Sequence, residues 1–402
     1  MKQSRRHFLG SAAAGAAFAG GGGTALAAAD AWVDLPMTNG RRPLASFPQK
    51  RALIVQSNRP PILETPFHVF DGSELTPNDA FYVRWHLAGI PTSVDGTAHR
   101  IAVHGLVNKP LNLSVAQLKS DFPAAEIIAV NQCSGNSRGL FSPRVAGGEW
   151  ANGGMGNARW RGVRLKDILA KAGIAAGAKQ VSFKGLDHGV LPVTPQFTKA
   201  LDMDMANSTD VIVAYEMNGA PLPLLNGYPV RLVVAGWFAT YWVKMLASIE
   251  VIDHVEDSFW MKTAYRIPDT PGNTVTPTQT GYATIPINKL RVRSFITNVT
   301  DGSKMVYGPH AIRGIAFDSG SGIKTVEFSG DGGMTWTAAT LGRDLGRYSF
   351  RKWETEWKPP GTGTFALACR ATTNSGETQG TVPVWNPPGY LRNNIETYAV
   401  TI

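Results

Sequence analysis

Cysteine is nearly absent from this sequence of 402 residues, which contains only Cys133 and Cys369. No CxxCH motif occurs, which excludes a covalently attached c-type haem in this chain. Cys369 alternates with Phe365 and Leu367 in an apolar segment, a pattern typical of a buried strand. Cys133 lies far upstream in a polar segment. We therefore expect two free thiols and no disulfide.

Charged residues are also sparse, at 17% of the chain, and the net charge of +9 comes from Lys and Arg that form no run. Because nucleic-acid-binding proteins gather such residues in basic stretches, we expect no nucleic-acid partner. Dispersed positive charge favours an anionic small substrate or an acidic partner instead. After the N-terminal region, no segment has the roughly 18 uninterrupted apolar residues that a membrane span needs.

The N-terminus carries the pair Arg5-Arg6, followed by an Ala- and Gly-rich stretch that runs to Ala29. Paired arginines, a weakly apolar stretch and small residues before a cleavage site predict a twin-arginine export signal over residues 1–29. A membrane anchor is the alternative, but Gly and Ala make the stretch hardly hydrophobic. We expect a periplasmic protein. Since this route exports folded chains, a cofactor inserted before export is also expected.

The rest of the chain is long enough for two domains, which we expect to meet near residue 285. Plentiful Gly and Pro with few charges favour strands and ordered loops over a helical bundle. Residues 30–284 mix both element types, which predicts an α+β domain. Its clearest elements are strands expected at 100–107 and 180–185 and helices expected at 114–119 and 165–172.

Residues 285–402 have an all-β pattern. Residues 323–329 alternate apolar and polar side chains, and a glycine-rich turn follows them. Residues 334–338 can then form a second, antiparallel strand, so the segment predicts a hairpin. Further alternating segments at 348–357 and 363–371 predict a small β-sandwich of immunoglobulin type.

A polar loop containing Cys133 follows a strand-like apolar run at 127–130. Residues 130–139 read VNQCSGNSRG, which is too polar and too poor in helix formers for a core helix. A cysteine on a loop at the end of a strand can be half of a disulfide, a nucleophile or a metal ligand. With a disulfide disfavoured, the residues alone leave the other two open.

Three more segments place cations among apolar residues: YVRWHL at 82–87, GYPVRLVV at 227–234 and WVK at 242–244. With CSGNSR at 133–138, and in this order, they resemble the sulfite oxidase family of molybdenum enzymes. The resemblance is greatest to the bacterial periplasmic sulfite dehydrogenases and spans essentially the whole mature chain. It implies a molybdopterin-binding catalytic domain over residues 30–284 and a dimerisation sandwich over 285–402.

The resemblance also implies the cofactor, a molybdenum-molybdopterin of the non-nucleotide form, with Cys133 as the sole protein ligand of the metal. A soft thiolate suits such a metal, and the neighbouring glycines let a bulky group approach the backbone. Asn226 stands where animal members have a histidine, and His188 is our candidate for the missing cation. The implied cofactor-binding residues are Tyr82, Arg84, His86, Cys133, Asp187, Asn226, Arg231, Trp242 and Lys244.

The implied substrate pocket contains Arg84, Arg138, Trp150 and Tyr265. Two arginines suit sulfite, a small and mostly dianionic ligand, because they give charge-assisted hydrogen bonds. Trp150 would exclude solvent, and Tyr265 would help couple electron exit to proton loss.

The implied activity is oxidation of sulfite to sulfate, with electrons passed singly to an external c-type cytochrome. The chain would form a homodimer, or a heterodimer with a cytochrome subunit. A sulfane dehydrogenase acting on carrier-bound sulfur is the alternative within this class. A nitrate reductase fits less well, because those chains add haem and flavin domains. A non-catalytic secreted binding protein is the alternative from another class, and it would contain no metal.

Overall fold

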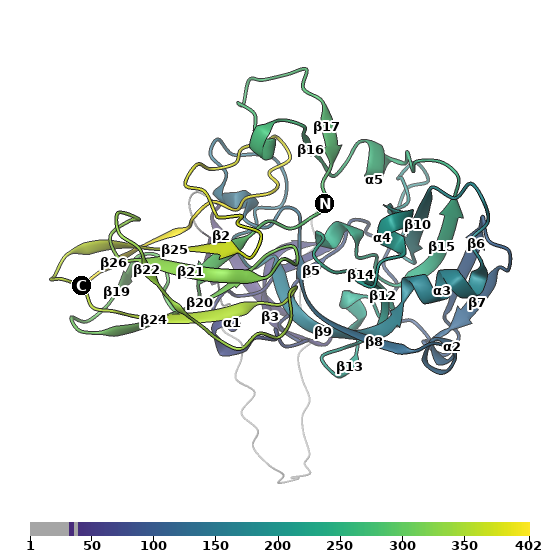
Figure 1. Ribbon diagram of the computed structural model, residues 1–402, viewed down its shortest axis with the longest axis horizontal. Helices are drawn as coiled ribbons and strands as arrows, with labels where there is room; N and C mark the ends of the chain where they lie inside the picture. The colour runs from purple at the N-terminus through teal and green to yellow at the C-terminus, as the bar shows by residue number, and fades with distance from the viewer. Residues whose placement is uncertain (1–31, 36–38) are drawn as a thin grey trace, which may run out of the picture.

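The computed structural model describes residues 32–35 and 39–402, so the predicted export signal at 1–29 lies outside the described residues. The described chain is mainly β with few short helices, which confirms the predicted fold class. Figure 1 shows the two parts beside each other, with the sandwich at one end of the long axis. No helix in the described ranges is long and apolar enough to cross a membrane.

Three five-stranded sheets form most of the first domain. The N-terminal sheet follows chain order and contains β1 (Trp32–Asp34), β2 (Arg41–Phe47), β3 (Lys50–Asn58), β4 (Pro61–Glu64) and β5 (Val83–Arg84). A mixed sheet contains β6 (Arg100–Gly105), β7 (Leu111–Ser114), β10 (Gln180–Gly185), β11 (Thr198–Asp202) and β15 (Leu246–Ile252). The third sheet contains β8 (Ala124–Gln132), β9 (Met155–Arg164), β12 (Val211–Met217), β13 (Ala220–Pro221) and β14 (Arg231–Val234).

The helices of the first domain are short (Figure 1). Ser114 caps α2 through a capping box with Gln117, the pattern that satisfies free N–H groups at a helix start. The α-helices are α1 (Val69–Gly72), α2 (Val115–Asp121), α3 (Leu165–Ala172), α4 (Met203–Ala206) and α5 (Phe259–Lys262). The 3₁₀ turns are η1 (Arg138–Leu140), η2 (Leu224–Asn226), η3 (Ala239–Tyr241) and η4 (Pro271–Asn273).

The second domain contains two facing sheets, as the alternating sequence predicts. The predicted hairpin forms, with β21 (Ile323–Ser329) paired antiparallel to β22 (Thr337–Ala338). The remaining strands of the two sheets are β18 (Arg293–Ile296), β19 (Ser303–Lys304), β20 (His310–Phe317), β23 (Thr340–Leu341), β24 (Arg351–Trp357), β25 (Thr364–Thr373) and β26 (Thr397–Thr401). A ribbon of β16 (Arg266–Pro268) and β17 (Thr284–Pro286) precedes them.

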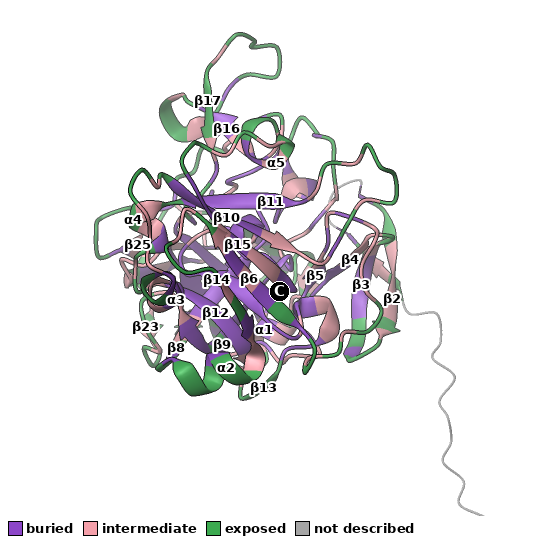
Figure 2. Cartoon of the chain, turned by 90° about the vertical axis from the view of Figure 1, so that its right-hand side faces the viewer, coloured by how far each residue is buried: buried purple, intermediate pink, exposed green. Residues whose placement is uncertain are grey.

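The two domains share one apolar core. Phe295, Phe317 and Phe350 of the second domain pack into the same cluster as the buried strands of the third sheet. Figure 2 shows these central strands as largely buried. The backbone N–H of Val130 donates to the carbonyl of Tyr348 at 2.9 Å. The strand that leads to Cys133 is therefore supported by both domains.

Candidate active site

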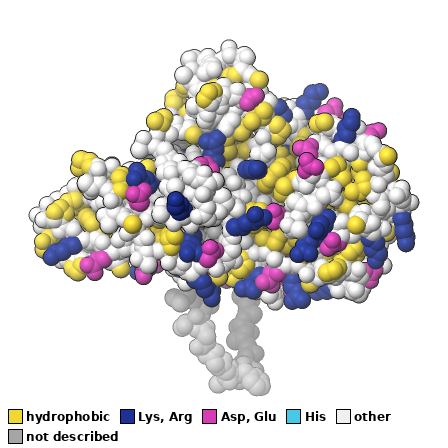
Figure 3. Space-filling model, in the orientation of Figure 1, with side chains coloured by type: hydrophobic (Ala, Val, Ile, Leu, Met, Phe, Trp, Pro, Cys, Tyr) yellow, Lys and Arg dark blue, Asp and Glu magenta, His cyan; other side chains and the backbone are white. Residues whose placement is uncertain are grey.

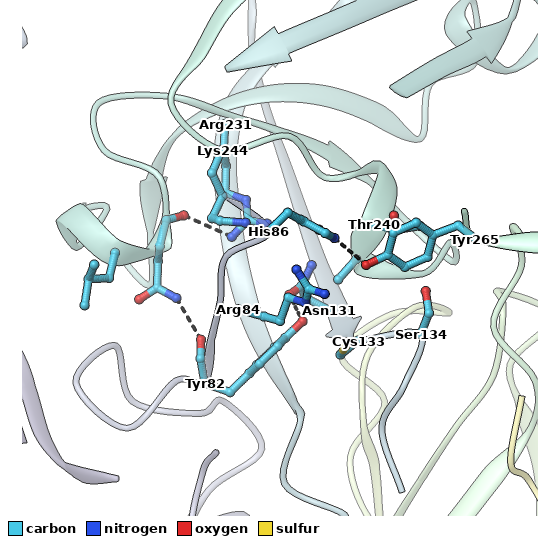
Figure 4. A pocket seen from close by; sticks show the side chains of 13 residues that line it. Tyr82, Arg84, His86, Asn131, Cys133, Ser134, Arg231, Thr240, Lys244 and Tyr265 are labelled. Carbon is cyan, nitrogen blue, oxygen red and sulfur yellow. Dashed lines mark hydrogen bonds between the residues drawn. The ribbon is translucent and has the colours of Figure 1, made fainter. Parts of the chain in front are cut away.

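A small cavity lies where β5, the end of β8 and the segments around β14 meet. Arg84 and His86 both line it, two residues apart on one face of an extended segment, as predicted. Figure 4 shows side chains from these separate segments converging on this space. The residues that line it are Tyr82, Arg84, His86, Asn131, Cys133, Ser134, Leu225, Asn226, Arg231, Ala239, Thr240, Lys244 and Tyr265.

Cys133 is held at the cavity wall by the hydrogen bonds of its own loop. Its N–H donates to Gly154 O at 2.9 Å, and its carbonyl accepts from Asn136 N at 3.0 Å. Gly154 N in turn donates to Asn136 Oδ1 at 2.8 Å. Both Cys133 and Cys369 are free and buried, which confirms the expectation that they do not pair.

Tyr265 and His86 form a neutral hydrogen-bonded pair on the cavity wall. The Tyr265 hydroxyl bonds His86 Nε2, and the imidazole stacks on Phe197 with ring centroids 3.9 Å apart. Burial lowers the pKa of His86 well below its usual value and raises the pKa of Tyr265. Tyr265 has φ of +59°, a strained conformation for a non-glycine residue that is common at functional sites. The pair thus places an uncharged phenol in the same cavity as Arg84, where an anion could bind.

Cations without matching carboxylates dominate one end of the cavity. Arg231 is fully buried and donates to Asn226 O at 3.0 Å and to Trp242 O at 3.1 Å. Burial, together with the positive charge of Arg231, lowers the pKa of Lys244 to about 7. Asp187 is the carboxylate whose charge opposes this shift, so two cations face one anion here. Such an excess of buried positive charge favours binding of an anion such as a phosphate.

Four buried polar atoms on the cavity wall have no hydrogen-bond partner among residues 32–35 and 39–402. They belong to Asn131 (Nδ2), Ser134 (Oγ), Arg231 (Nε) and Thr240 (Oγ1). An unsatisfied buried polar group costs about 1–3 kcal/mol, so proteins rarely leave several side by side. Their concentration around Cys133 indicates that the cavity is built for a polar ligand.

The other predicted site residues lie behind the wall rather than on it. Trp150 is buried and packs edge-on against Tyr82, with centroids 5.9 Å apart. Trp242 packs near the guanidinium of Arg231, at 5.7 Å, and Asp187 is buried beyond Lys244.

Arg138 is not among the residues that line this cavity, although its guanidinium lies beside Tyr390, whose ring stacks on the cavity residue Tyr265. It is half-buried, and its guanidinium is held through Nε by Pro388 O at 3.1 Å.

Lys50 contacts the cavity residue Asn226, and the sequence patterns did not predict this contact. Its buried ammonium donates to Asn78 O at 2.6 Å, to Phe81 O at 2.9 Å and to Asn226 Oδ1. His188, our candidate for a cation near Asn226, is exposed and does not line the cavity. Lys50 occurs in no motif and lies 176 residues before Asn226, so no local signal could have identified it.

Comparisons with known proteins agree with this geometry. Residues 87–260 match the family described as "Oxidoreductase molybdopterin binding domain", and residues 284–402 match "Mo-co oxidoreductase dimerisation domain". Sulfite oxidase of Gallus gallus is 34% identical over 86% of this chain and 77% of its own length. The chain belongs to the sulfite oxidase family. It is a molybdopterin-dependent oxidoreductase with a dimerisation domain.

Two further similarities bear on its activity. Mitochondrial sulfite oxidase of Macaca fascicularis is 33% identical over 87% of this chain, which spans 66% of that relative's length. The crystal structure titled sulfane dehydrogenase SoxCD, from Paracoccus pantotrophus, has a TM-score of 0.73 and 26% identity. The structural match covers 86% of this chain and 85% of the chain in that crystal structure. Tyr82, Arg84, His86 and Tyr265 lie outside the matched molybdopterin segment, so this family member completes its cavity with flanking elements.

Proposed function

We propose that this chain is a periplasmic sulfite dehydrogenase. It oxidises sulfite to sulfate at a molybdenum-molybdopterin cofactor and passes electrons singly to an external c-type cytochrome. The observation that carries the proposal is one cavity that joins a buried free thiol, Cys133, to cations and unsatisfied polar atoms. A soft metal ligand beside an anion-binding site is what this chemistry requires.

The residues of the cavity fit the cofactor. Cys133 would hold the metal, and Arg231 and Lys244 would bind the pterin phosphate. The unpartnered groups of Ser134 and Thr240 would bind polar atoms of the pterin. When bound, the cofactor supplies a centre for two-electron oxidation, and the protein binds and orients the anion beside it.

Arg84 is the residue best placed to bind sulfite. Its guanidinium lines the cavity, and Nη1 donates to Trp85 O at 2.9 Å. The guanidinium has five N–H donors, so others stay available for a charge-assisted bond to sulfite. The neutral hydroxyl of Tyr265 adds a donor without repelling the dianion. Because Tyr265 is buried and Arg84 is half-buried, these bonds are stronger than they would be in water.

An exposed apolar surface beside acidic residues supports an external, basic electron acceptor. Val255 and Phe259 are exposed, at 67% and 43%, and Asp253 and Asp257 lie on the same surface segment. Trp260 packs 5.0 Å from Phe259 and 6.3 Å from Tyr265 on the cavity wall, measured between ring centroids. A redox partner bound here would meet a series of aromatic rings that leads to the site. In Figure 3 the dark blue basic side chains are scattered over the visible face, so steering depends on local charge.

The similarity to the sulfane dehydrogenase structure favours a second candidate function, oxidation of carrier-bound sulfur. The two activities differ in substrate size, because a carrier must insert an arm into the cavity whereas sulfite enters alone. Activity with free sulfite and not with a sulfane-loaded carrier would support the first candidate.

Metal analysis combined with turnover tests the proposal. Protein exported by a host that makes the cofactor is expected to contain about one molybdenum per chain, bound through Cys133. Sulfite should then drive reduction of ferricyanide or a c-type cytochrome. A metal-free protein without sulfite turnover would instead support a secreted binding protein.

A further inference from the structure

A turn of the second domain projects Tyr390 towards the active site of the first. Asn386 closes this turn: its Oδ1 accepts from Tyr390 N at 2.9 Å, and its Nδ2 donates to Tyr390 O at 3.0 Å. Gly389 and Leu391, on either side of Tyr390, both have positive φ, of +64° and +65°. Leucine rarely adopts this conformation, so the surrounding structure must stabilise it. The bend buries the Tyr390 side chain.

The same turn encloses Arg138. Arg138 Nε donates to Pro388 O at 3.1 Å, and the guanidinium lies 5.2 Å from the centroid of the Tyr390 ring. Residue 389 must be glycine, because a Cβ there would lie 2.8 Å from Cγ of Arg138. Arg138 has no carboxylate partner among the residues that the structure describes. Its charge is therefore available to an anion.

The Tyr390 ring also stacks on Tyr265. The two rings are parallel, with an interplanar angle of 3° and centroids 5.6 Å apart. One side chain of the second domain thus contacts both Arg138 and a phenol that lines the cavity. A contact through the ring face adds to the bonds from Arg138 Nε to Pro388 O and from Nη1 to Gly148 O, at 3.1 and 3.4 Å, and leaves further N–H donors available.

We propose that Tyr390 is a positioning residue for the substrate anion. Its aromatic face holds Arg138 and Tyr265 in the arrangement that binds the oxyanion. This inference rests on the proposed function, because it takes a small oxyanion as the ligand of Arg138. It makes the second domain part of the substrate site, beyond a role in dimerisation.

Two substitutions distinguish a role of the Tyr390 aromatic face from a role of its volume alone. Tyr390→Phe keeps the ring, whereas Tyr390→Leu keeps apolar volume and removes the ring. In the loaded enzyme with ferricyanide, we expect Y390L to raise KM for sulfite about tenfold with kcat changed less than threefold. Y390F should change each constant less than twofold. Arg138→Gln should reproduce the KM effect, and Tyr307→Ala, at an exposed tyrosine of the same domain, should change neither constant.

Thermal stabilisation by sulfate gives a second readout, which does not require turnover. Sulfate should raise the melting temperature of the wild type, and Y390L should need about tenfold more sulfate for the same rise. If the wild type fails to oxidise sulfite, the proposed function is wrong and this measurement alone decides the role of Tyr390. The inference is overturned if Y390L matches the wild type, if Y390F is as impaired as Y390L, or if sulfate has no effect on the wild type.

Discussion

Cys133 is a small buried side chain whose sulfur takes part in no hydrogen bond that the structure records, so its removal tests function with little effect on folding. Cys133→Ser keeps the size and the backbone bonds of the loop but replaces a soft ligand with a hard, protonated one. We expect the variant to fold, to lose bound molybdenum and to lose sulfite oxidation. Metal content by elemental analysis and the melting temperature would be measured together.

The other cysteine provides the control. Cys369 lies in the apolar core of the second domain, where burial raises the pKa of its thiol to about 12. Cys369→Ala should cost about 1 kcal/mol of stability and leave activity per molybdenum unchanged. Full sulfite oxidation by Cys133→Ser would refute the assignment of the metal ligand.

Buried lysines near the cavity predict an unusual pH dependence. Burial lowers the pKa of Lys50 to about 7 from its ordinary 10.5. Between these two values the unfolded chain binds a proton at this site and the folded chain does not. The free energy of unfolding should therefore rise with pH across this window, by at most about 1.4 kcal/mol per pH unit for one lysine.

Substitution of Lys50 tests this sign. Lys50→Met removes the titrating group, so the free energy of unfolding of the cofactor-free protein should rise less steeply between pH 7 and 10. Denaturant titrations at several pH values measure the slope, and Lys304→Met, at an exposed lysine, serves as the control. An unchanged slope would mean that the Lys50 ammonium keeps its proton in the folded state.

At the scale of elements, the loop after β8 depends on an ion pair of the second domain. Arg293 donates to Ser137 Oγ at 2.9 Å within the CSGNSR loop and pairs with Glu396 at 3.0 Å. Both side chains of this pair are buried, and Glu396 also pairs with Arg392 at 2.9 Å. The charge of one glutamate thus fixes two arginines and, through them, the loop that presents Cys133.

Neutralising that carboxylate should weaken both the fold and the site. Glu396→Gln leaves two buried arginines without a counter-charge, and breaking a buried pair costs about 3–5 kcal/mol. We expect a corresponding loss in the free energy of unfolding and lower molybdenum content. Glu126→Gln breaks the exposed pair with Arg159 and should cost at most about 1 kcal/mol. Equal stabilities of the two variants would contradict this role for the buried pair.

Elements and motifs could be predicted from sequence where their signal is local. The helix at 165–172 and the strand at 180–185 form with the predicted bounds. Both are specified by the spacing of apolar residues and by the residues at their ends, which are close together in the sequence. The apolar segment GYPVRLVV at 227–234 is a strand only from Arg231, after the cis peptide before Pro229. Lys50 and Tyr390 could not be predicted, since each meets the site through contacts between residues far apart in the sequence.

At the scale of the whole molecule, the two domains form one catalytic unit. They share an apolar core, and the second domain contacts the Cys133 loop through Arg293 and Arg138 through its 386–391 turn. The acidic and apolar segment around Phe259 belongs to the first domain. Tyr265 lies between this segment and the 386–391 turn, because it packs near Trp260 on one side and stacks on Tyr390 on the other. Substrate binding thus depends on both domains, whereas the proposed acceptor would dock on the first.

The identity of the electron acceptor can be tested through the salt dependence of its reduction. Two electrons of each turnover must leave singly across a protein interface, and such encounters are small and steered by charge. We expect a basic c-type cytochrome to be reduced readily and oxygen to be used poorly. The rate should fall as salt rises, because the screening length is about 8 Å at physiological ionic strength. Stopped-flow mixing of sulfite-reduced enzyme with cytochrome across a salt series measures this.

A charge reversal locates the interface. Asp257→Lys should slow cytochrome reduction several-fold at low salt and lose most of that effect at high salt, since only the steering term changes. The same variant should reduce ferricyanide, a small anion, at least as fast as the wild type. Because Asp257 is exposed and makes no ion pair in the described structure, the substitution should leave stability unchanged. Equal slowing with both acceptors would place the defect at the cofactor, and fast reoxidation by oxygen without cytochrome reduction would exclude a dehydrogenase.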